Sequence, residues 1–133
     1  MMTQEDKMLL IKDLSSRIPY AVHVQHISGV SGILHDISIF HKYDKNDNIY
    51  DVICYTDFLG SSIGIEQFKP YLFPVSSMTE EQKKEYQYIT ERWMYDSSYS
   101  ISDSIDWLNK HHFDYRHLIE KGLAIDATGL NIY

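Results

Sequence analysis

The spacing of apolar residues predicts a helix at the start of the chain. Thr3 places a capping hydroxyl ahead of the acidic pair Glu5 and Asp6. Apolar side chains then recur close to the helical period, at Met8, Ile11, Leu14 and Ile18. Because proline lacks an amide hydrogen and has a fixed φ, we expect this helix to end before Pro19.

The period changes to two after this helix. Over 20–25, Val22 and Val24 alternate with His23 and Gln25, which is the pattern of a strand. Two further strands are expected over 33–40 and 49–55. The polar and glycine-containing segments 28–32 and 43–48 supply turn residues between them. The three strands are therefore predicted to form an antiparallel meander.

The second half of the chain returns to the helical period. A short helix is expected over 65–72, with Pro70 near its edge. Thr79 and Gln82 have the spacing of a capping box, which opens a helix. Its apolar stripe contains Tyr86, Ile89 and Trp93. Another helix carries Ile101, Ile105 and Leu108, and Asp114 is expected to cap a last short helix that runs through Glu120 and closes at Gly122. The remaining residues, 123–133, add at most one short strand.

This order of elements predicts the fold class. A doubly wound parallel sheet needs strands that alternate with helices, whereas here the strands come together and most helices follow. We therefore predict an α+β fold, with a small antiparallel sheet of about three strands followed by a helical C-terminal half. The 133 residues, 44% of them apolar, suit a single domain over 1–133.

The charge balance narrows the classes of partner. Twelve Lys and Arg against 19 Asp and Glu give a formal charge of −7, which opposes binding to a phosphate backbone. The single Cys54 excludes an intramolecular disulfide and suits a reducing compartment. The first apolar run, 8–11, is too short for a signal sequence or a membrane span. We expect a cytoplasmic protein with neither a nucleic-acid nor a membrane partner.

Tyrosine is unusually frequent, with 11 residues. Its ring is apolar and its hydroxyl forms hydrogen bonds, so tyrosine suits both the rim of a small core and protein interfaces. The interface candidates in the helical half are Tyr95, Tyr99, Trp107 and Tyr115, although Trp107 also fits a core position.

One segment matches the G-x-S-x-G pattern of serine hydrolases, in which Ser62 would be the nucleophile. Asp103, Asp106 or Asp114 would then orient His117 as the base. Such a nucleophile needs a central parallel strand before it and a helix directly after it. The predicted antiparallel sheet and Gly64 both oppose this, so an ordinary loop is the simpler interpretation.

The metal-binding patterns are incomplete. Asp44, Asn46 and Asn48 match the first ligands of a calcium loop, but Ile49 and Tyr55 occupy its obligatory glycine and glutamate positions. His111, His112 and His117 lack the i, i+4 spacing that aims two imidazoles at one zinc ion. Cys54 has no base beside it in sequence and suits a buried strand position. We therefore assign no catalytic, cofactor-binding or metal-ligating residue.

Several segments resemble a family of small uncharacterised proteins from gut Bacteroidetes genomes and their phages or prophages. The segments that carry this resemblance are 69–72, 76–81 and above all 106–116 with 121–124, and the similarity extends over most of the chain from Ile18 onward. The stretch that holds Trp107 and Tyr115 is its specific part. This chain has His117 where the family usually has a small residue and His111 where it has a polar one. The resemblance implies no activity and no site residues.

These observations favour a non-enzymatic binding or accessory protein of phage or mobile-element origin that contacts a protein partner through tyrosine-rich surface. Two alternatives stay open. An acidic protein can mimic nucleic acid and occupy a DNA-binding enzyme, with carboxylates in place of phosphates. A small hydrolase or metal-dependent enzyme would use Ser62 or the residues between His111 and His117. The oligomeric state is left open.

Overall fold

The computed structural model describes residues 2–40, 51–56, 63–98 and 100–133. Helix α1 spans Gln4–Arg17, and its N-terminus is capped by the Thr3 hydroxyl, which accepts a hydrogen bond from the Asp6 amide at 3.0 Å. The helix ends before Pro19 as predicted, and a 3₁₀ turn follows over Ile18–Tyr20.

The predicted meander is confirmed. Strands β1 (His23–His26), β2 (Ser31–Phe40) and β3 (Asp51–Thr56) are adjacent and antiparallel, with His23 opposite Ile33 and Ile37 opposite Cys54. The short strand β4 (Ile63–Gly64) adds to β3.

The expected helix over 65–72 is wrong. A single 3₁₀ turn covers Ile65–Gln67, and strand β5 (Phe68–Pro74) then pairs antiparallel with β1. Pro70 lies buried within β5, opposite Val24. The side chains of Phe68, Tyr71 and Leu72 are all buried, because both faces of this strand are covered.

The sheet is mixed rather than purely antiparallel, which corrects the second part of the fold prediction. The strand order is β4-β3-β2-β1-β5, and β5 also pairs in parallel with β6 (Phe113–Asp114) and β7 (Ile125–Asp126). Nor are the helices confined to the C-terminal half, since α1 precedes every strand. The α+β class itself is confirmed.

The expected helix from Asp114 to Glu120 is also wrong, although its capping residue behaves as predicted. The Asp114 carboxylate accepts hydrogen bonds from the Leu118 and Ile119 amides, each at 2.9 Å. His117, however, has a left-handed backbone with φ of 59°, which interrupts helical geometry. The segment therefore folds as consecutive turns and ends at Gly122, whose φ is 74°.

The main core lies between α1 and the sheet. Leu10, Ile11 and Leu14 of α1 pack with apolar residues from β1, β2, β3, β5, the segments just before β1 and β5, and the C-terminal segment: Val22, Val24, Leu34, Cys54, Ile65, Phe68, Leu72, Leu118, Leu123 and Ala124. No helix in the described part of the chain is long and apolar enough to cross a membrane.

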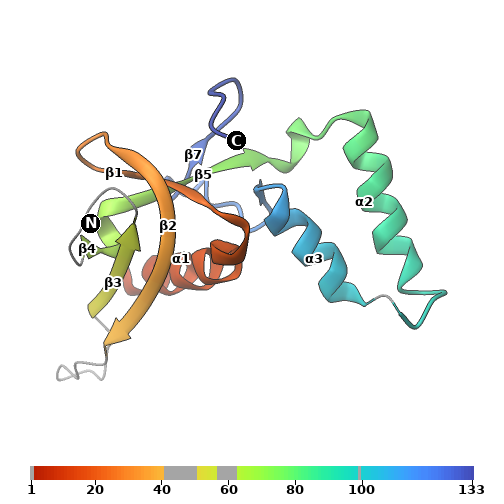
Figure 1. Ribbon diagram of the computed structural model, residues 1–133, viewed down its shortest axis with the longest axis horizontal. Coiled ribbons are helices and arrows are strands. Elements are labelled where there is room, and N and C mark those ends of the chain that lie inside the picture. Colours follow the sequence, from red (N-terminus) through yellow and green to blue (C-terminus); the bar gives the residue numbers. More distant parts are fainter. Residues whose placement is uncertain (1, 41–50, 57–62, 99) are drawn as a thin grey trace.

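Helices α2 (Glu80–Arg92) and α3 (Ile101–Lys110) form an antiparallel pair that extends from this body, and we call the pair the arm (Figure 1). A 3₁₀ turn over Val75–Ser77 joins β5 to the arm. The predicted capping box of α2 is confirmed, because the Thr79 hydroxyl accepts from the Gln82 amide and the Gln82 side chain accepts from the Thr79 amide.

Candidate functional site

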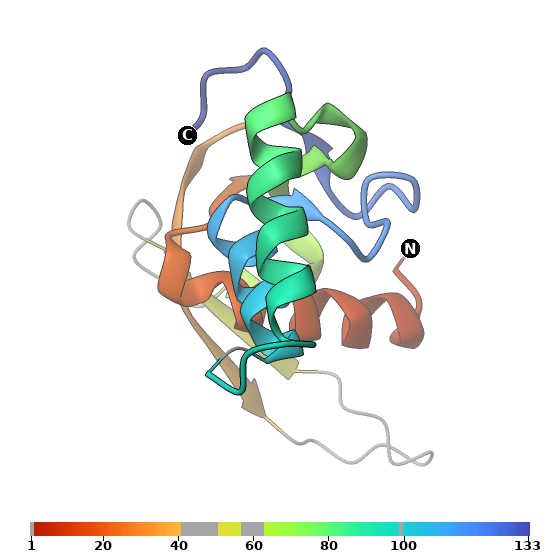
Figure 2. The ribbon, with the colours of Figure 1, turned by 90° about the vertical axis from the view of Figure 1, so that its right-hand side faces the viewer.

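Helix α2 forms the outer layer of the arm and contributes no fully buried residue. It packs on α3 through Tyr86 and Ile89, whose side chains are half-buried, and the Thr90 and Ser104 hydroxyls form a hydrogen bond of 3.2 Å across the pair. In the view from the side of the arm, the green helix α2 lies nearest the viewer, in front of the rest of the molecule (Figure 2). One face of this helix is therefore open to solvent along its length.

The base of the arm contains a second, aromatic core. Trp107 stacks on Phe113 with a centroid distance of 5.7 Å and contacts Tyr86 at 5.5 Å. Met78 and Leu108 complete this cluster. The arm is therefore anchored by its base, and its free end lies beyond this packing.

Exposed apolar side chains gather toward the free end of the arm, where α2 ends and α3 begins. Tyr95 is 82% exposed, Met94 64%, Ile101 64% and Trp93 43%. One or two turns back along the two helices, Tyr88 and Ile105 are also exposed. We call these six residues the distal surface. Single exposed apolar side chains are ordinary in proteins, whereas groups of large ones are typical of interaction sites.

A hollow of about 320 Å³ lies on the open face of α2, between Tyr88 and Tyr95. Glu91 and Arg92 complete its lining. The Arg92 guanidinium lies over the Tyr88 ring, 4.7 Å from its centroid. The hollow thus lies between two aromatic rings, that of Tyr88 on α2 and that of Tyr95 in the turn after the helix. Aromatic side chains that line a concave surface are common anchors of protein interfaces.

The predicted interface residues occupy different environments. Tyr95 belongs to the distal surface, and Tyr99 lies outside the described residues. Trp107 is only 6% exposed and belongs to the core at the base of the arm. Tyr115 is half-buried, and its hydroxyl donates to the Asn109 side chain at 2.9 Å.

Sequence reasoning assigned Trp93, Ile101 and Ile105 to buried helix stripes and did not single out Met94. The run Trp93-Met94-Tyr95 carried a usable signal, because three consecutive large apolar residues at the end of a helix cannot all face one core. At least one of them had to be exposed, and all three are.

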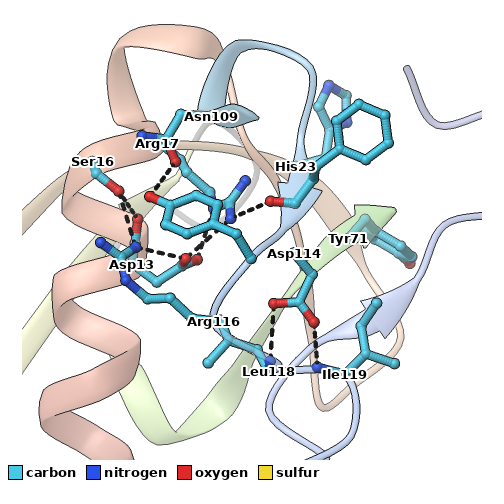
Figure 3. A network of polar contacts seen from close by, with 12 residues as sticks. Asp13, Ser16, Arg17, His23, Tyr71, Asn109, Asp114, Arg116, Leu118 and Ile119 are labelled. Atoms are coloured by element: carbon cyan, nitrogen blue, oxygen red, sulfur yellow. Dashed lines mark hydrogen bonds and ion pairs between the residues drawn. The ribbon is translucent and has the colours of Figure 1, made fainter. Parts of the chain in front are cut away.

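A buried ionic network joins α1 to the base of the arm (Figure 3). The Arg17 guanidinium donates to both carboxylate oxygens of Asp13, at 2.8 and 3.1 Å, and to the Phe113 carbonyl at 2.7 Å. Arg116 donates to the same carboxylate at 2.9 Å. The side chains of Asp13 and Arg17 are fully buried. Sequence reasoning missed this network. The i, i+4 spacing of Asp13 and Arg17 on α1 was a usable local signal, but their other partners, Phe113 and Arg116, lie 96 and 103 residues away in sequence.

This network is structural. Tyr115 lies between the two arginines, with the Arg116 guanidinium 4.7 Å and the Arg17 guanidinium 5.3 Å from its ring centroid. Both carboxylate oxygens of Asp13 accept from arginines and the side chain is fully buried, so a substrate in solution has no access to this group. The network holds α1, α3 and β6 in fixed positions.

The three histidines of the metal hypothesis do not converge. His112 is buried and stacks on Tyr133 with a centroid distance of 3.5 Å, while His111 packs against Trp107. His117 is exposed beside Glu120, 3.4 Å away. Within the described ranges, no group of three His, Cys, Asp or Glu side chains is placed to hold a metal ion.

Burial is the largest cause of the pKa shifts of His112 and Cys54. It lowers the pKa of His112 to about 4, and the positive charge of Arg17 adds to this effect. It also raises the pKa of the Cys54 thiol to about 12. Cys54 is buried in β3 as expected, and a thiol that stays protonated is a poor nucleophile.

The remaining enzyme candidates have little geometric support. Ser62 and the segment 43–48 with Asp44, Asn46 and Asn48 lie outside the described residues, so the hydrolase and calcium-loop patterns stay predictions. A hollow of about 380 Å³ contains Asp114 and His117. Asp114 accepts hydrogen bonds from the Leu118 and Ile119 amides, however, and the His117 Nδ1 atom lies 3.4 Å from the Glu120 carboxylate instead.

Comparison of the chain with protein-family models, with curated proteins and with solved structures finds no match. The distal surface is a feature of the described residues in which several strongly exposed apolar side chains lie close together in sequence.

Proposed function

We propose that this chain is a non-enzymatic binding or accessory protein that acts by contacting a protein partner through its distal surface. The observation that carries the proposal is the gathering of exposed aromatic and aliphatic side chains toward the free end of the arm, with Tyr95, Met94 and Ile101 the most exposed. Burying such groups releases water from apolar area and so favours association. Trp, Tyr and Met are also enriched at protein interfaces.

The shape of the molecule supports this role. The network around Asp13 and the aromatic cluster around Trp107 fix the arm at its base, so its free end is presented on a rigid element. A preorganised surface loses little conformational entropy when it binds. The sequence resemblance described above implies a phage or mobile-element origin. With that origin, the proposed partner is a host or phage protein.

The experiment compares capture of proteins from host lysate by the wild type and by a variant with Met94→Ser and Tyr95→Ser. Its matched control is Ile27→Ser with Val30→Ser, which replaces two exposed apolar residues at the β1–β2 turn, far from the arm (Figure 1). We expect a specific protein that the wild type and the control retain and the arm variant loses. Capture of nothing above background, or equal capture by all three proteins, would overturn the proposal. Circular dichroism of each variant verifies that it folds.

A further inference from the structure

The charged groups around the distal surface are mostly acidic. Between residues 88 and 106, the carboxylates are Glu91, Asp96, Asp103 and Asp106, whereas Arg92 is the only lysine or arginine. Four negative charges against one positive charge leave a net charge of −3 in this segment. The free end of the arm therefore combines apolar anchors with a negative rim.

The charges of this rim are compensated only in part, by the positive charge of Arg92 acting on Asp96. Glu91 accepts a hydrogen bond from Gln87, Asp96 accepts from Ser98, and Asp103 accepts from the Ser100 amide. All these donors are neutral, and the described residues show no ion pair to any of the four carboxylates. Arg92 is directed over the Tyr88 ring. An excess of negative charge therefore remains around the distal surface.

The negative rim selects among possible occupants. A second copy of the chain would bring one acidic rim against another, and nucleic acid or an anionic membrane would meet the same repulsion. A basic protein segment meets complementary charge instead. An apolar side chain of that segment could then insert between Tyr88 and Tyr95, in the hollow of about 320 Å³.

We infer that the distal surface binds a basic amphipathic segment of a protein partner, whose apolar side chains contact Tyr88, Met94 and Tyr95 while its lysines or arginines face Glu91, Asp96 and Asp106. This inference rests on the proposed function and deepens it by naming the chemistry of the partner. Binding of such a segment should weaken as the salt concentration rises, because salt screens the exposed charges.

The test measures binding of two fluorescent synthetic helical peptides to the full chain by anisotropy. Both peptides carry the same leucine and tryptophan face, and their polar face is lysine in one and glutamate in the other. We expect the lysine peptide to bind and the glutamate peptide to bind at least tenfold more weakly. Equal binding of the two peptides, or binding that does not change between about 50 and 500 mM salt, would overturn the inference.

Charge-neutralising variants locate the site. The first combines Glu91→Gln, Asp96→Asn and Asp106→Asn, which keep side-chain oxygens that can accept hydrogen bonds. Three exposed ion pairs predict a loss of roughly tenfold in affinity for the lysine peptide. The matched control makes the same charge change elsewhere, with Glu5→Gln, Glu120→Gln and Asp126→Asn.

We expect the control variant to stay within about twofold of the wild type. Equal weakening by both triples would show attraction to net charge alone and would overturn the inference. A dimer that Tyr95→Ser dissociates, seen by sedimentation, would also overturn it in favour of a second copy. If the lysine peptide fails while the host capture succeeds, this inference is wrong and the proposed function stands. Failure of both experiments overturns both proposals.

Discussion

Replacing Asp13 by Asn removes the carboxylate that holds two arginines at the junction of α1 and the arm. The change is nearly isosteric, so it removes charge and leaves packing intact. Arg17 is fully buried and would keep only the Phe113 carbonyl as a strong acceptor. Removing one partner of a buried ion pair typically costs about 3–5 kcal/mol, because the other charge stays buried without compensation.

Urea denaturation measures this cost. With a slope m of about 1.5 kcal/mol/M, a loss of about 3 kcal/mol lowers the midpoint by about 2 M. The control is Lys83→Ala, which breaks the exposed pair with Glu80 at 3.2 Å and should change stability by less than about 0.5 kcal/mol. A loss of less than about 1 kcal/mol in the free energy of unfolding of D13N would refute this prediction.

A double-mutant cycle separates the ion pair from other effects of each substitution. Arg17→Met alone should also destabilise the fold, since Asp13 would keep only Arg116. The double variant should cost less than the sum of the two single variants by at least about 1 kcal/mol. Additive losses would show that Asp13 and Arg17 contribute independently to stability, which would contradict the coupling expected from their ion pair.

Three further predictions concern local stability and titration. Thr79→Ala removes the capping hydroxyl of α2 and should cost about 1 kcal/mol of stability. Because α2 buries no residue fully, amide hydrogen exchange should accelerate in α2 more than in the sheet. An equal acceleration in both would contradict this prediction. His112 has a folded pKa near 4 against an unfolded pKa near 6.5, so the unfolded chain binds more protons between these values. The contribution of neutral His112 to folding stability is complete above about pH 6.5 and falls by up to about 3 kcal/mol as the pH drops to 4. Asparagine suits the left-handed backbone at this position, where φ is 63°, so H112N is the matched variant. Its urea midpoint should fall less steeply with decreasing pH than that of the wild type. Iodoacetamide should label Cys54 only as fast as the chain opens, and rapid labelling of the native protein would contradict its burial.

The sequence predicted those elements whose signals are local. Thr3 and the pair of Thr79 and Gln82 mark helix starts through hydrogen bonds that span three residues, and the structure contains both caps. The period-two pattern of β1, β2 and β3 was sufficient because consecutive strands joined by turns pair with each other.

The failures involve long-range contacts. Strand β5 shows no clear alternation because both of its faces are covered, and its pairing with β1, β6 and β7 comes from distant segments. The left-handed backbone of His117 was also missed, because the residues next to it in sequence do not predict a positive φ. The tyrosine count could not separate exposed from buried positions: Tyr95 is exposed, whereas Tyr71 is buried in the sheet.

Site-specific photocrosslinking tests the central claim most directly. A benzophenone amino acid replaces Tyr95 in one protein and Ile27 in another, so that the probe replaces a strongly exposed side chain in each. Irradiation in host lysate should yield a discrete adduct from position 95 that Met94→Ser reduces, and none from position 27. Adducts of equal yield at both positions, or none at position 95, would contradict the claim that the distal surface of the arm binds a protein.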